Sequence, residues 1–207
     1  MSFDPDDFLN EILENLDKMK PIRIEEIPNI DLYMDQVRSF MERHLGGTKR
    51  HSEDVVLTKA MINNYAKNDL LPPPVLKKYG RKHIIFLILI YYFKNVLSIN
   101  DLRKLLGPLA DSYFRKKDGL RLEDVCNRAF QLMSKQVGDL KEFIEETVRE
   151  AGDAASRDMA GSETEEDAWL LQGFYLICTL AFDAYLKRRL IEDILDMTPD
   201  RKKKKKP

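Results

Sequence analysis

The stretch LTKAMINNYAKNDLLPPPVLKKYGRKH, residues 57–83, joins a short helical pattern to three prolines and a cluster of lysine and arginine. Its first part has apolar residues at helical spacing, which predicts a helix over residues 58–67 with Thr58 as its N-cap. Asn63 and Asn64 are poor choices for a helix interior, because their amides compete with the backbone for hydrogen bonds. Their presence indicates that something other than helix formation selected them.

The side of this helix opposite its apolar residues carries Lys59, Asn63 and Lys67, four residues apart. We expect the apolar side to pack and this polar side to stay exposed. An asparagine amide can pair with both N6 and N7 of adenine in the major groove, and a lysine can reach a phosphate or a guanine. The exposed side therefore has the chemistry of a DNA-reading surface.

Charge is unevenly distributed along the 207-residue chain, although the net charge is only −1. Residues 1–47 contain 5 Lys and Arg against 11 Asp and Glu, residues 48–106 contain 11 against 4, and residues 107–207 contain 18 against 20. A basic middle between acidic flanks is typical of a segment that faces a polyanion. A solvated lysine-rich face has the same composition, and charge alone leaves both interpretations open.

The apolar spacing is three or four almost throughout, which predicts an all-α protein with no sheet. Gly46-Gly47 and Gly107-Pro108 are expected to end the second and fifth helices, and residues 152–167 to form a mobile connector. The predicted helices cover residues 5–18, 32–44, 58–67, 81–96, 98–106, 122–151 and 165–197.

Two apolar segments bear on localisation. The run at 84–93 has ten residues, about half of the roughly 20 that a membrane-spanning helix needs, and indicates a buried helix. Residues 169–186 are nearly as apolar, but Gln172 and Asp183 favour a core or subunit-contact helix over a membrane span. The acidic N-terminus does not resemble a secretory signal. We therefore predict a cytoplasmic protein without a membrane partner.

Enzymatic and metal chemistry find little support in the sequence. His44, His51 and His83 have no partner at helical spacing and no neighbouring cysteine, so we predict no metal site and read them as surface or capping groups. Cys126 and Cys178 are read as buried small apolar residues. No phosphate-binding loop, dinucleotide fingerprint or nucleophile elbow occurs. We predict no catalytic residue and no cofactor, and leave any small-molecule effector unknown.

The two C-terminal helices indicate self-association. From Leu122 onward an apolar stripe continues for roughly eight helical turns, and the last helix is apolar nearly all round. The two helices can cover one another within a chain, and they can also meet their counterparts in a two-fold dimer. We expect both, with the dimer contact in residues 110–200.

Residues 57–106 resemble the DNA-binding domain of mercury-resistance-regulator (MerR) proteins. The stretches LTKAMINNYA, DLL, LKKY, HIIFLILI and LSINDLRKLL follow the order of that family's helix, turn, wing and two further helices. The resemblance implies a winged helix-turn-helix and places Asn63, Asn64, Tyr65 and Lys77 at positions of base and phosphate contact. The segment Pro72–Val75 is shorter than the usual connection, so we expect a rigid basic loop in place of a regular hairpin wing.

At a finer level, IPNIDLYMDQV at 27–37, MINNYAKNDLLPPPVLKKYGRKH and LSINDLRKLL resemble domain of unknown function 1836, over about residues 20–125. This second resemblance implies a MerR-like fold and no assigned chemistry. Together with the exposed helix face, the resemblances imply the following DNA-contact residues: Thr58, Lys59, Asn63, Asn64, Tyr65, Lys67, Lys77, Lys78, Tyr79 and Arg81.

These observations predict four parts: an acidic N-terminal arm (1–27), a MerR-like helix-turn-helix domain (28–109), a helical dimerisation and sensing module (110–200) and a disordered basic tail (201–207). The predicted function is sequence-specific binding of double-stranded DNA, as a dimer, to regulate transcription. The alternative is a protein-interaction module that keeps the helix-turn-helix fold without binding DNA. Whether the tail is native stays open.

Overall fold

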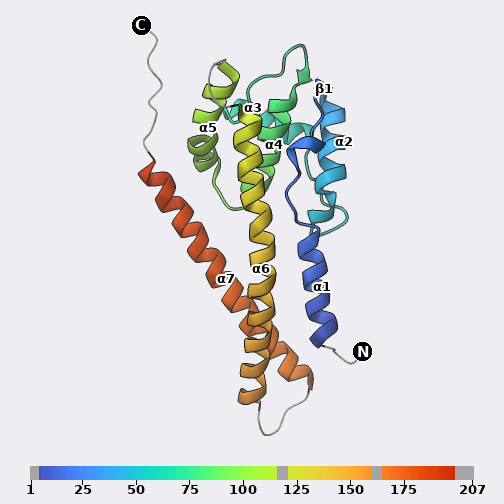
Figure 1. The fold of residues 1–207 in the computed structure, drawn as a ribbon, viewed down its shortest axis with the longest axis vertical. Coiled ribbons are helices and arrows are strands. Elements are labelled where there is room, and N and C mark those ends of the chain that lie inside the picture. The colour runs from blue at the N-terminus through green and yellow to red at the C-terminus, as the bar shows by residue number, and fades with distance from the viewer. Residues whose placement is uncertain (1–4, 116–120, 160–164, 199–207) are drawn as a thin grey trace. The chain divides into compact units, whose positions relative to one another are not determined.

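The computed structural model describes residues 5–115, 121–159 and 165–198 (Figure 1). Within these residues the chain is mostly helical, as its apolar spacing predicted. The predicted basic tail lies outside the described residues. The elements are α1 (Pro5–Asp17), η1 (Ile24–Glu26), β1 (Leu32–Tyr33), α2 (Met34–Leu45), η2 (Gly46–Thr48), α3 (Lys59–Lys67), β2 (Lys78–Tyr79), α4 (Arg81–Phe93), α5 (Ile99–Arg115), α6 (Leu122–Asp158) and α7 (Glu165–Met197).

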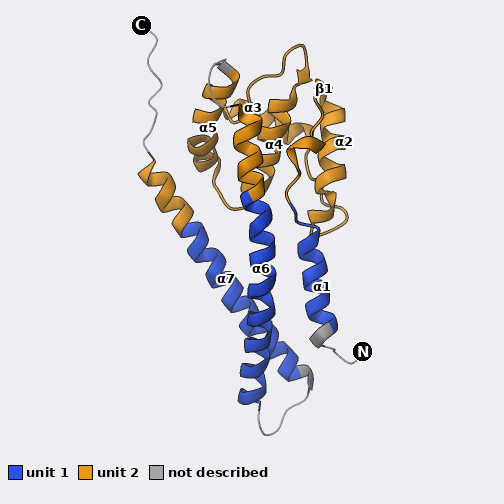
Figure 2. Ribbon diagram, in the orientation of Figure 1, with its two compact units in different colours: residues 1–20, 132–189 blue, residues 21–131, 190–207 orange. Residues whose placement is uncertain are grey.

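The chain divides into two compact units, whose boundaries differ from the predicted domain boundaries. Unit 1 comprises residues 1–20 and 132–189, and unit 2 comprises residues 21–131 and 190–207 (Figure 2). The long helices α6 and α7 each contribute to both units. We describe each unit by itself.

Helix α4 is the centre of unit 2. Every residue from Ile84 to Ile90 is buried, so α4 is surrounded on all sides by other elements. The neighbouring helices each contribute a stripe of buried apolar residues to the core, including Val37, Met41 and Leu45 of α2, Ile62 and Tyr65 of α3, and Leu102 and Leu106 of α5. The prediction of a buried helix at this apolar run is confirmed.

Unit 2 also contains a small sheet that the sequence did not predict. Strand β1 pairs antiparallel with β2, with Leu32 opposite Tyr79 and Tyr33 opposite Lys78. Each strand has two residues, which is too short for an alternating pattern to stand out. Strand β1 leads directly into α2, and β2 is followed by Gly80 and then α4, so the sheet holds the starts of these two helices together.

The predicted stop at Gly107-Pro108 is wrong, because α5 continues through both residues to Arg115. A proline inside a helix removes one backbone hydrogen bond and costs about 3 kcal/mol. Leu106 and Ala110, on either side of it, are both buried in the core. Packing of this apolar side therefore outweighs the local cost of Pro108.

Unit 1 joins the N-terminal helix to the two C-terminal helices. Ile144, Val148 and Ala151 of α6 form a buried cluster with Leu176 of α7, and apolar residues of α1 pack against it, namely Phe8, Leu9, Ile12 and Leu16. Lys141 donates a hydrogen bond of 2.7 Å to Asp17. Hydrogen bonds from Lys141 and Lys20 lower the pKa of the Asp17 carboxyl to about 2. Helix α1 is thus an amphipathic helix that packs within unit 1.

The predicted connector over residues 152–167 is wrong for its first part, because α6 continues to Asp158. Ala151 and Ala155 lie four residues apart and are both buried. Ala155 continues the packing side of the predicted helix beyond Ala151, whereas its segment in the sequence resembles a polar linker. Residues 160–164 of the predicted connector lie outside the described part of the chain.

Helix α7 presents a large apolar surface. Among the described residues, the segment Asp167–Met197 has the length and composition of a membrane-crossing helix, which by itself is weak evidence of a membrane. Between residues 169 and 186, seven large apolar side chains are at least 43% exposed: Trp169, Leu170, Phe174, Ile177, Phe182, Tyr185 and Leu186. Cys178, predicted to be buried, is exposed on the same helix, whereas Cys126 is buried.

Candidate nucleic-acid interface

Helix α3 begins as the sequence predicted. The backbone N–H of Met61 donates to the Thr58 hydroxyl oxygen at 3.1 Å, so Thr58 is the N-cap of a helix that starts at Lys59. Ile62 and Tyr65 bury the apolar side of the helix. The Thr58 hydroxyl oxygen accepts this bond, so its own O–H can still donate to a phosphate.

Two contacts fix the start of α3 against the first turns of α2. Arg38 Nε donates to the carbonyl oxygen of Leu57 at 3.2 Å, and Lys59 Nζ lies 3.3 Å from Asp35 Oδ1. The side chains of Lys59 and Asp35 are 59% and 72% exposed, and exposed ion pairs contribute little to stability. Lys59 can therefore exchange Asp35 for another anion at small cost.

The exposed side of α3 is polar, as predicted. Lys59, Asn63 and Lys67 lie on it at intervals of four residues, and all three are exposed. Within the described part of the chain, the Asn63 amide has no hydrogen-bonding partner. An exposed amide between two cations is free to bind a ligand that offers both donors and acceptors.

Asn64 differs from its neighbour, because it belongs to a network at the end of α3. Asn68 Nδ2 donates to Asn64 Oδ1 at 3.0 Å and to the Asn64 carbonyl at 2.9 Å. Arg103 of α5 donates to the carbonyl of Asn68 at 2.9 Å and to its side-chain oxygen at 3.3 Å. The sequence did not assign Asn68 or Arg103 a role, because the network depends on α5 lying beside the end of α3.

The chain leaves α3 through a residue with an unusual backbone conformation. Asp69 has a φ of 56°, and the backbone N–H groups of Leu70 and Leu71 both bond to the carbonyl of Tyr65. Aspartate tolerates this left-handed conformation better than most residues. It therefore takes the place that glycine commonly has after a helix.

The prediction that Tyr65 and Tyr79 contact DNA is corrected, because both side chains are buried. Tyr65 is 6% exposed and Tyr79 is 4% exposed, and burial raises the pKa of both hydroxyl groups. Both rings belong to the core of unit 2, so neither offers a surface to DNA. Both tyrosines occupy positions that face the core, and packing is sufficient to explain an aromatic residue at each of them.

The predicted rigid loop after the three prolines is in fact a tight hairpin. Val75 and Lys78 exchange two backbone hydrogen bonds, of 3.1 and 2.9 Å, around Leu76 and Lys77. Both central residues have a positive φ, 49° and 63°, which is the signature of a type I′ turn. A two-residue turn fits into the short segment, and it was missed because type I′ turns normally contain Asn or Gly.

The side chains of the hairpin differ in their exposure to solvent. Val75 is 69% exposed and Leu76 is 88% exposed, and Lys77 is exposed as well. Lys78 is half-buried, and its ammonium group lies 5.2 Å from the centre of the Tyr33 ring. Lys77 is thus free to reach an anion, whereas Lys78 is partly held by β1.

The predicted DNA contact of Arg81 is also corrected, because its guanidinium is turned toward the protein. One terminal nitrogen donates to the carbonyl of Ile24 at 2.7 Å, and Nε is buried without a partner among the described residues. The neighbouring Lys82 donates to the carbonyl of Tyr113 at 2.6 Å. Both cations hold α4 to adjacent segments, so the Arg81 guanidinium is not available to contact DNA.

His83 connects the hairpin to α4 in the way a capping residue does. Its Nδ1 accepts the backbone N–H of Gly80 at 3.1 Å, and Nε2 lies 3.4 Å from the carbonyl of Pro73. Burial lowers the pKa of the imidazole below its ordinary 6.5. A neutral ring with its proton on Nε2 satisfies both contacts, so His83 fixes the proline segment that precedes the hairpin.

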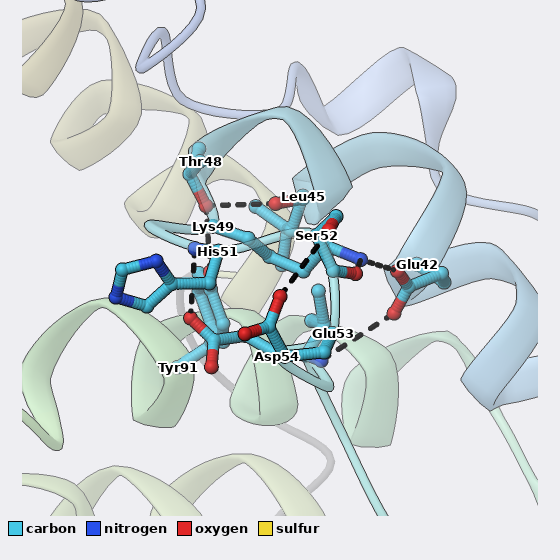
Figure 3. A network of polar contacts seen from close by, with 10 residues as sticks. Glu42, Leu45, Thr48, Lys49, His51, Ser52, Glu53, Asp54 and Tyr91 are labelled. Atoms are coloured by element: carbon cyan, nitrogen blue, oxygen red, sulfur yellow. Dashed lines mark hydrogen bonds and ion pairs between the residues drawn. The ribbon is translucent and has the colours of Figure 1, made fainter.

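The loop between α2 and α3 is also held in place. Glu42 accepts hydrogen bonds from Lys49 Nζ at 2.6 Å and from the backbone N–H of Val56 at 3.4 Å, while the Thr48 and Tyr91 hydroxyl groups lie 2.6 Å apart (Figure 3). The hydrogen bond from Lys49 lowers the pKa of the Glu42 carboxyl. The loop therefore has a defined path that brings Leu57 back to α2.

An open groove of about 720 Å³ lies between α2 and this loop. Charged groups of both signs line it, among them Arg38, Arg43, Glu42 and Glu53. Small-molecule sites are mostly apolar with few polar groups, and this groove does not have that character. Among the described residues, no three His, Cys, Asp or Glu side chains are grouped to hold a metal ion.

The model of one protein family, a domain of unknown function (DUF1836), matches residues 22–129, which is more than half of the chain. The chain belongs to this family. No curated protein and no solved structure matches the chain. The DUF1836 region contains the sheet and helices α2 to α5, together with the first turns of α6. The exposed side of α3 and the hairpin therefore lie within the DUF1836 region, whereas the apolar surface of α7 lies outside it.

Proposed function

We propose that the protein regulates transcription by sequence-specific binding of double-stranded DNA, through a MerR-like helix-turn-helix. The exposed side of α3 carries the proposal: the unpaired amide of Asn63 lies between Lys59 and Lys67 at helical spacing. A bidentate amide reads adenine and flanking cations bind phosphates, so this arrangement suits the major groove. The Asn63 amide forms no hydrogen bond within the described residues, and the exposed ion pair of Lys59 with Asp35 contributes little to stability.

The order of elements supports this proposal. A strand, two helices, a hairpin and two further helices follow one another from β1 to α5. In a helix-turn-helix protein the second helix lies in the major groove and the first crosses the DNA backbone. We assign these roles to α3 and α2, with the hydrogen bond from Arg38 to the carbonyl of Leu57 holding the start of α3 to α2.

The proposed contacts are fewer than the sequence implied. Asn63 contacts a base edge, while Lys59, Lys67 and Lys77 contact phosphates. Lys78 contributes charge from its place beside Tyr33. Asn64 orients the end of α3 through Asn68 and does not itself read a base.

We propose further that the protein acts as a homodimer through α7. Large side chains at these exposures each present on the order of 100 Å². Seven of them approach the roughly 800 Å² per partner of a specific interface and exceed the apolar patches usual on a monomer. Asp183 lies within the same stretch and would be costly in lipid, which favours a second copy over a bilayer and agrees with a cytoplasmic protein.

Gel-shift experiments test the proposal. The probe is the DNA upstream of the protein's own gene, with random duplex of equal length as the control, at 50 and 200 mM salt. We expect preferential binding of the upstream DNA that persists at the higher salt concentration, while binding of random DNA is lost. Equal binding of both duplexes at both concentrations would contradict sequence-specific recognition.

A protein-interaction module is the second candidate function, and the exposed apolar side of α7 favours it. Such a surface can bind another protein as well as a second copy. This candidate predicts no DNA binding at low salt and a complex that survives high salt, because apolar contacts are not screened. The same gel-shift series therefore separates the two functions.

A further inference from the structure

The hairpin between α3 and α4 carries an apolar tip that folding alone does not explain. Leu76 is 88% exposed and has a positive φ of 49°. A bulky residue in this conformation is a genuine outlier, and a type I′ turn strongly favours Asn followed by Gly. The pair Leu76-Lys77 therefore lowers the free energy of unfolding relative to Asn-Gly. Strained residues of this kind concentrate at functional sites.

Hydrogen bonds and side-chain contacts on both sides fix the position of the hairpin tip. Two backbone hydrogen bonds close the turn, and β2 continues directly into the pairing with β1. His83 holds the carbonyl of Pro73 on one side, and Lys78 rests on the Tyr33 ring on the other. Figure 1 shows the segment between α3 and α4 as a projection at the top of the view. The Leu76 side chain thus points away from the core from a fixed base.

Two lysines follow the tip residue directly. Lys77 is exposed, and Lys78 lies beside the Tyr33 ring. Residues 75–80 contain no carboxylate. An apolar side chain among cations is suited to a polyanion with an apolar interior. Double-stranded DNA has this character, because phosphates line the minor groove and stacked bases lie beneath them. Architectural DNA-binding proteins insert Leu, Ile, Phe or Met between base pairs in this way.

We infer that Leu76 is a minor-groove wedge. When α3 occupies a major groove, the hairpin enters the adjacent minor groove, Leu76 inserts between two base pairs, and Lys77 contacts a flanking phosphate. This inference rests on the proposed function. Pyrimidine–purine steps unstack most easily, so the wedge selects DNA with a TA or CA step at that position. Sequence preference then extends beyond the bases that Asn63 contacts.

The test uses 30-base-pair duplexes that the wild-type full chain selects from a randomised pool. Dyes at the two ends report bending, and 2-aminopurine at the pyrimidine–purine step reports unstacking. The wild-type protein is expected to bend the duplex and raise the 2-aminopurine fluorescence. Leu76→Asn should abolish both signals and weaken binding by about tenfold, with an unchanged salt dependence because no cation is removed.

Two variants serve as controls. Leu76→Met keeps an apolar side chain and should retain bending and unstacking. Val96→Asn makes the same kind of change at an exposed valine beyond the other end of α4, and should behave as the wild type. Asparagine suits the turn better than leucine, so loss of folding does not explain a loss of bending in Leu76→Asn.

Three outcomes would overturn the inference. If Leu76→Asn bends and unstacks the duplex as the wild type does, the wedge is wrong and the proposed function stands. If Leu76→Asn lowers the sedimenting mass and leaves bending unchanged, the tip packs against a second copy. If the wild-type chain selects no duplex from the pool, the proposed function falls and the wedge falls with it.

Discussion

Asn64 Oδ1 accepts a hydrogen bond of 3.0 Å from Asn68 Nδ2, and Arg103 in turn binds the oxygen of that same Asn68 amide. The adjacent Asn63 points its amide to solvent with no partner in the described part of the chain. Two neighbouring asparagines of one helix therefore have different tasks. Asn64 stabilises the end of α3, and Asn63 is available for recognition.

Alanine substitutions should separate these two tasks in stability measurements. Asn63→Ala is expected to raise the free energy of unfolding by about 0.5 kcal/mol, because alanine is the better helix former. Asn64→Ala should lower it by about 0.5 kcal/mol, because the lost hydrogen bond outweighs the same gain. Urea denaturation of both variants measures the difference. Equal stability of the two would show that the Asn64 network contributes nothing.

The hairpin should become more stable with conventional turn residues. A type I′ turn keeps both central residues left-handed, a conformation that costs about 1–2 kcal/mol in ordinary residues and less in Asn and Gly, so replacing Leu76-Lys77 by Asn-Gly lowers this cost. We expect the free energy of unfolding to rise by about 1–3 kcal/mol, with an unchanged dependence on urea concentration. A decrease in stability would mean that Leu76 and Lys77 contribute to the fold.

Stability should depend on pH through His83. Burial lowers the pKa of this imidazole in the folded state, and a bond from the N–H of Gly80 to Nδ1 further requires that nitrogen to be unprotonated. The unfolded chain therefore binds more protons as the pH falls below 6.5, and the free energy of unfolding decreases. Above pH 6.5 this contribution is fully present.

Urea titrations at pH 7.5, 6.5 and 5.5 measure this effect, and His83→Gln is the matched control. Glutamine at this position can still accept the N–H of Gly80 as part of a capping box, but it does not titrate. The variant should show a smaller loss of stability between pH 7.5 and 5.5 than the wild type. An identical loss in both proteins would assign the pH dependence to other groups.

The dimer should depend on the exposed side of α7. Ile177 is 67% exposed, and an aspartate there would be buried without a partner in a dimer contact. Sedimentation at tens of micromolar should give a dimer for the wild type and a monomer for Ile177→Asp. Gln136→Asp places the same charge on an exposed position of α6 and should remain dimeric. A monomeric wild type would contradict the proposed dimer, and binding of the wild type to neutral lipid vesicles would favour a membrane instead.

Local signals in the sequence were sufficient for several elements. Thr58 before an apolar-periodic stretch predicted the N-cap of α3, and ten successive apolar residues predicted the buried α4. Gly46 ends α2 as expected. Each of these features depends on residues within about one turn of the element.

Features that depend on tertiary contacts were not predictable in this way. Pro108 lies inside α5 because buried neighbours on both sides keep the helix continuous. Asn64 and Tyr65 resembled contact residues until their packing partners were known, since one sequence does not distinguish an exposed amide from a bonded one. The turn at Leu76 was missed because its residues oppose the usual preference for Asn and Gly.

The central claim is that Asn63 reads a base, and paired binding measurements test it most directly. Dissociation constants are measured for the upstream duplex and for random DNA, with the wild type, Asn63→Ala and Lys67→Ala. We predict that Asn63→Ala loses about 1–3 kcal/mol on the upstream duplex alone, whereas Lys67→Ala weakens both duplexes alike and lowers the salt dependence by about one counterion. Equal weakening of both duplexes by Asn63→Ala, or no weakening at all, would contradict base recognition by α3.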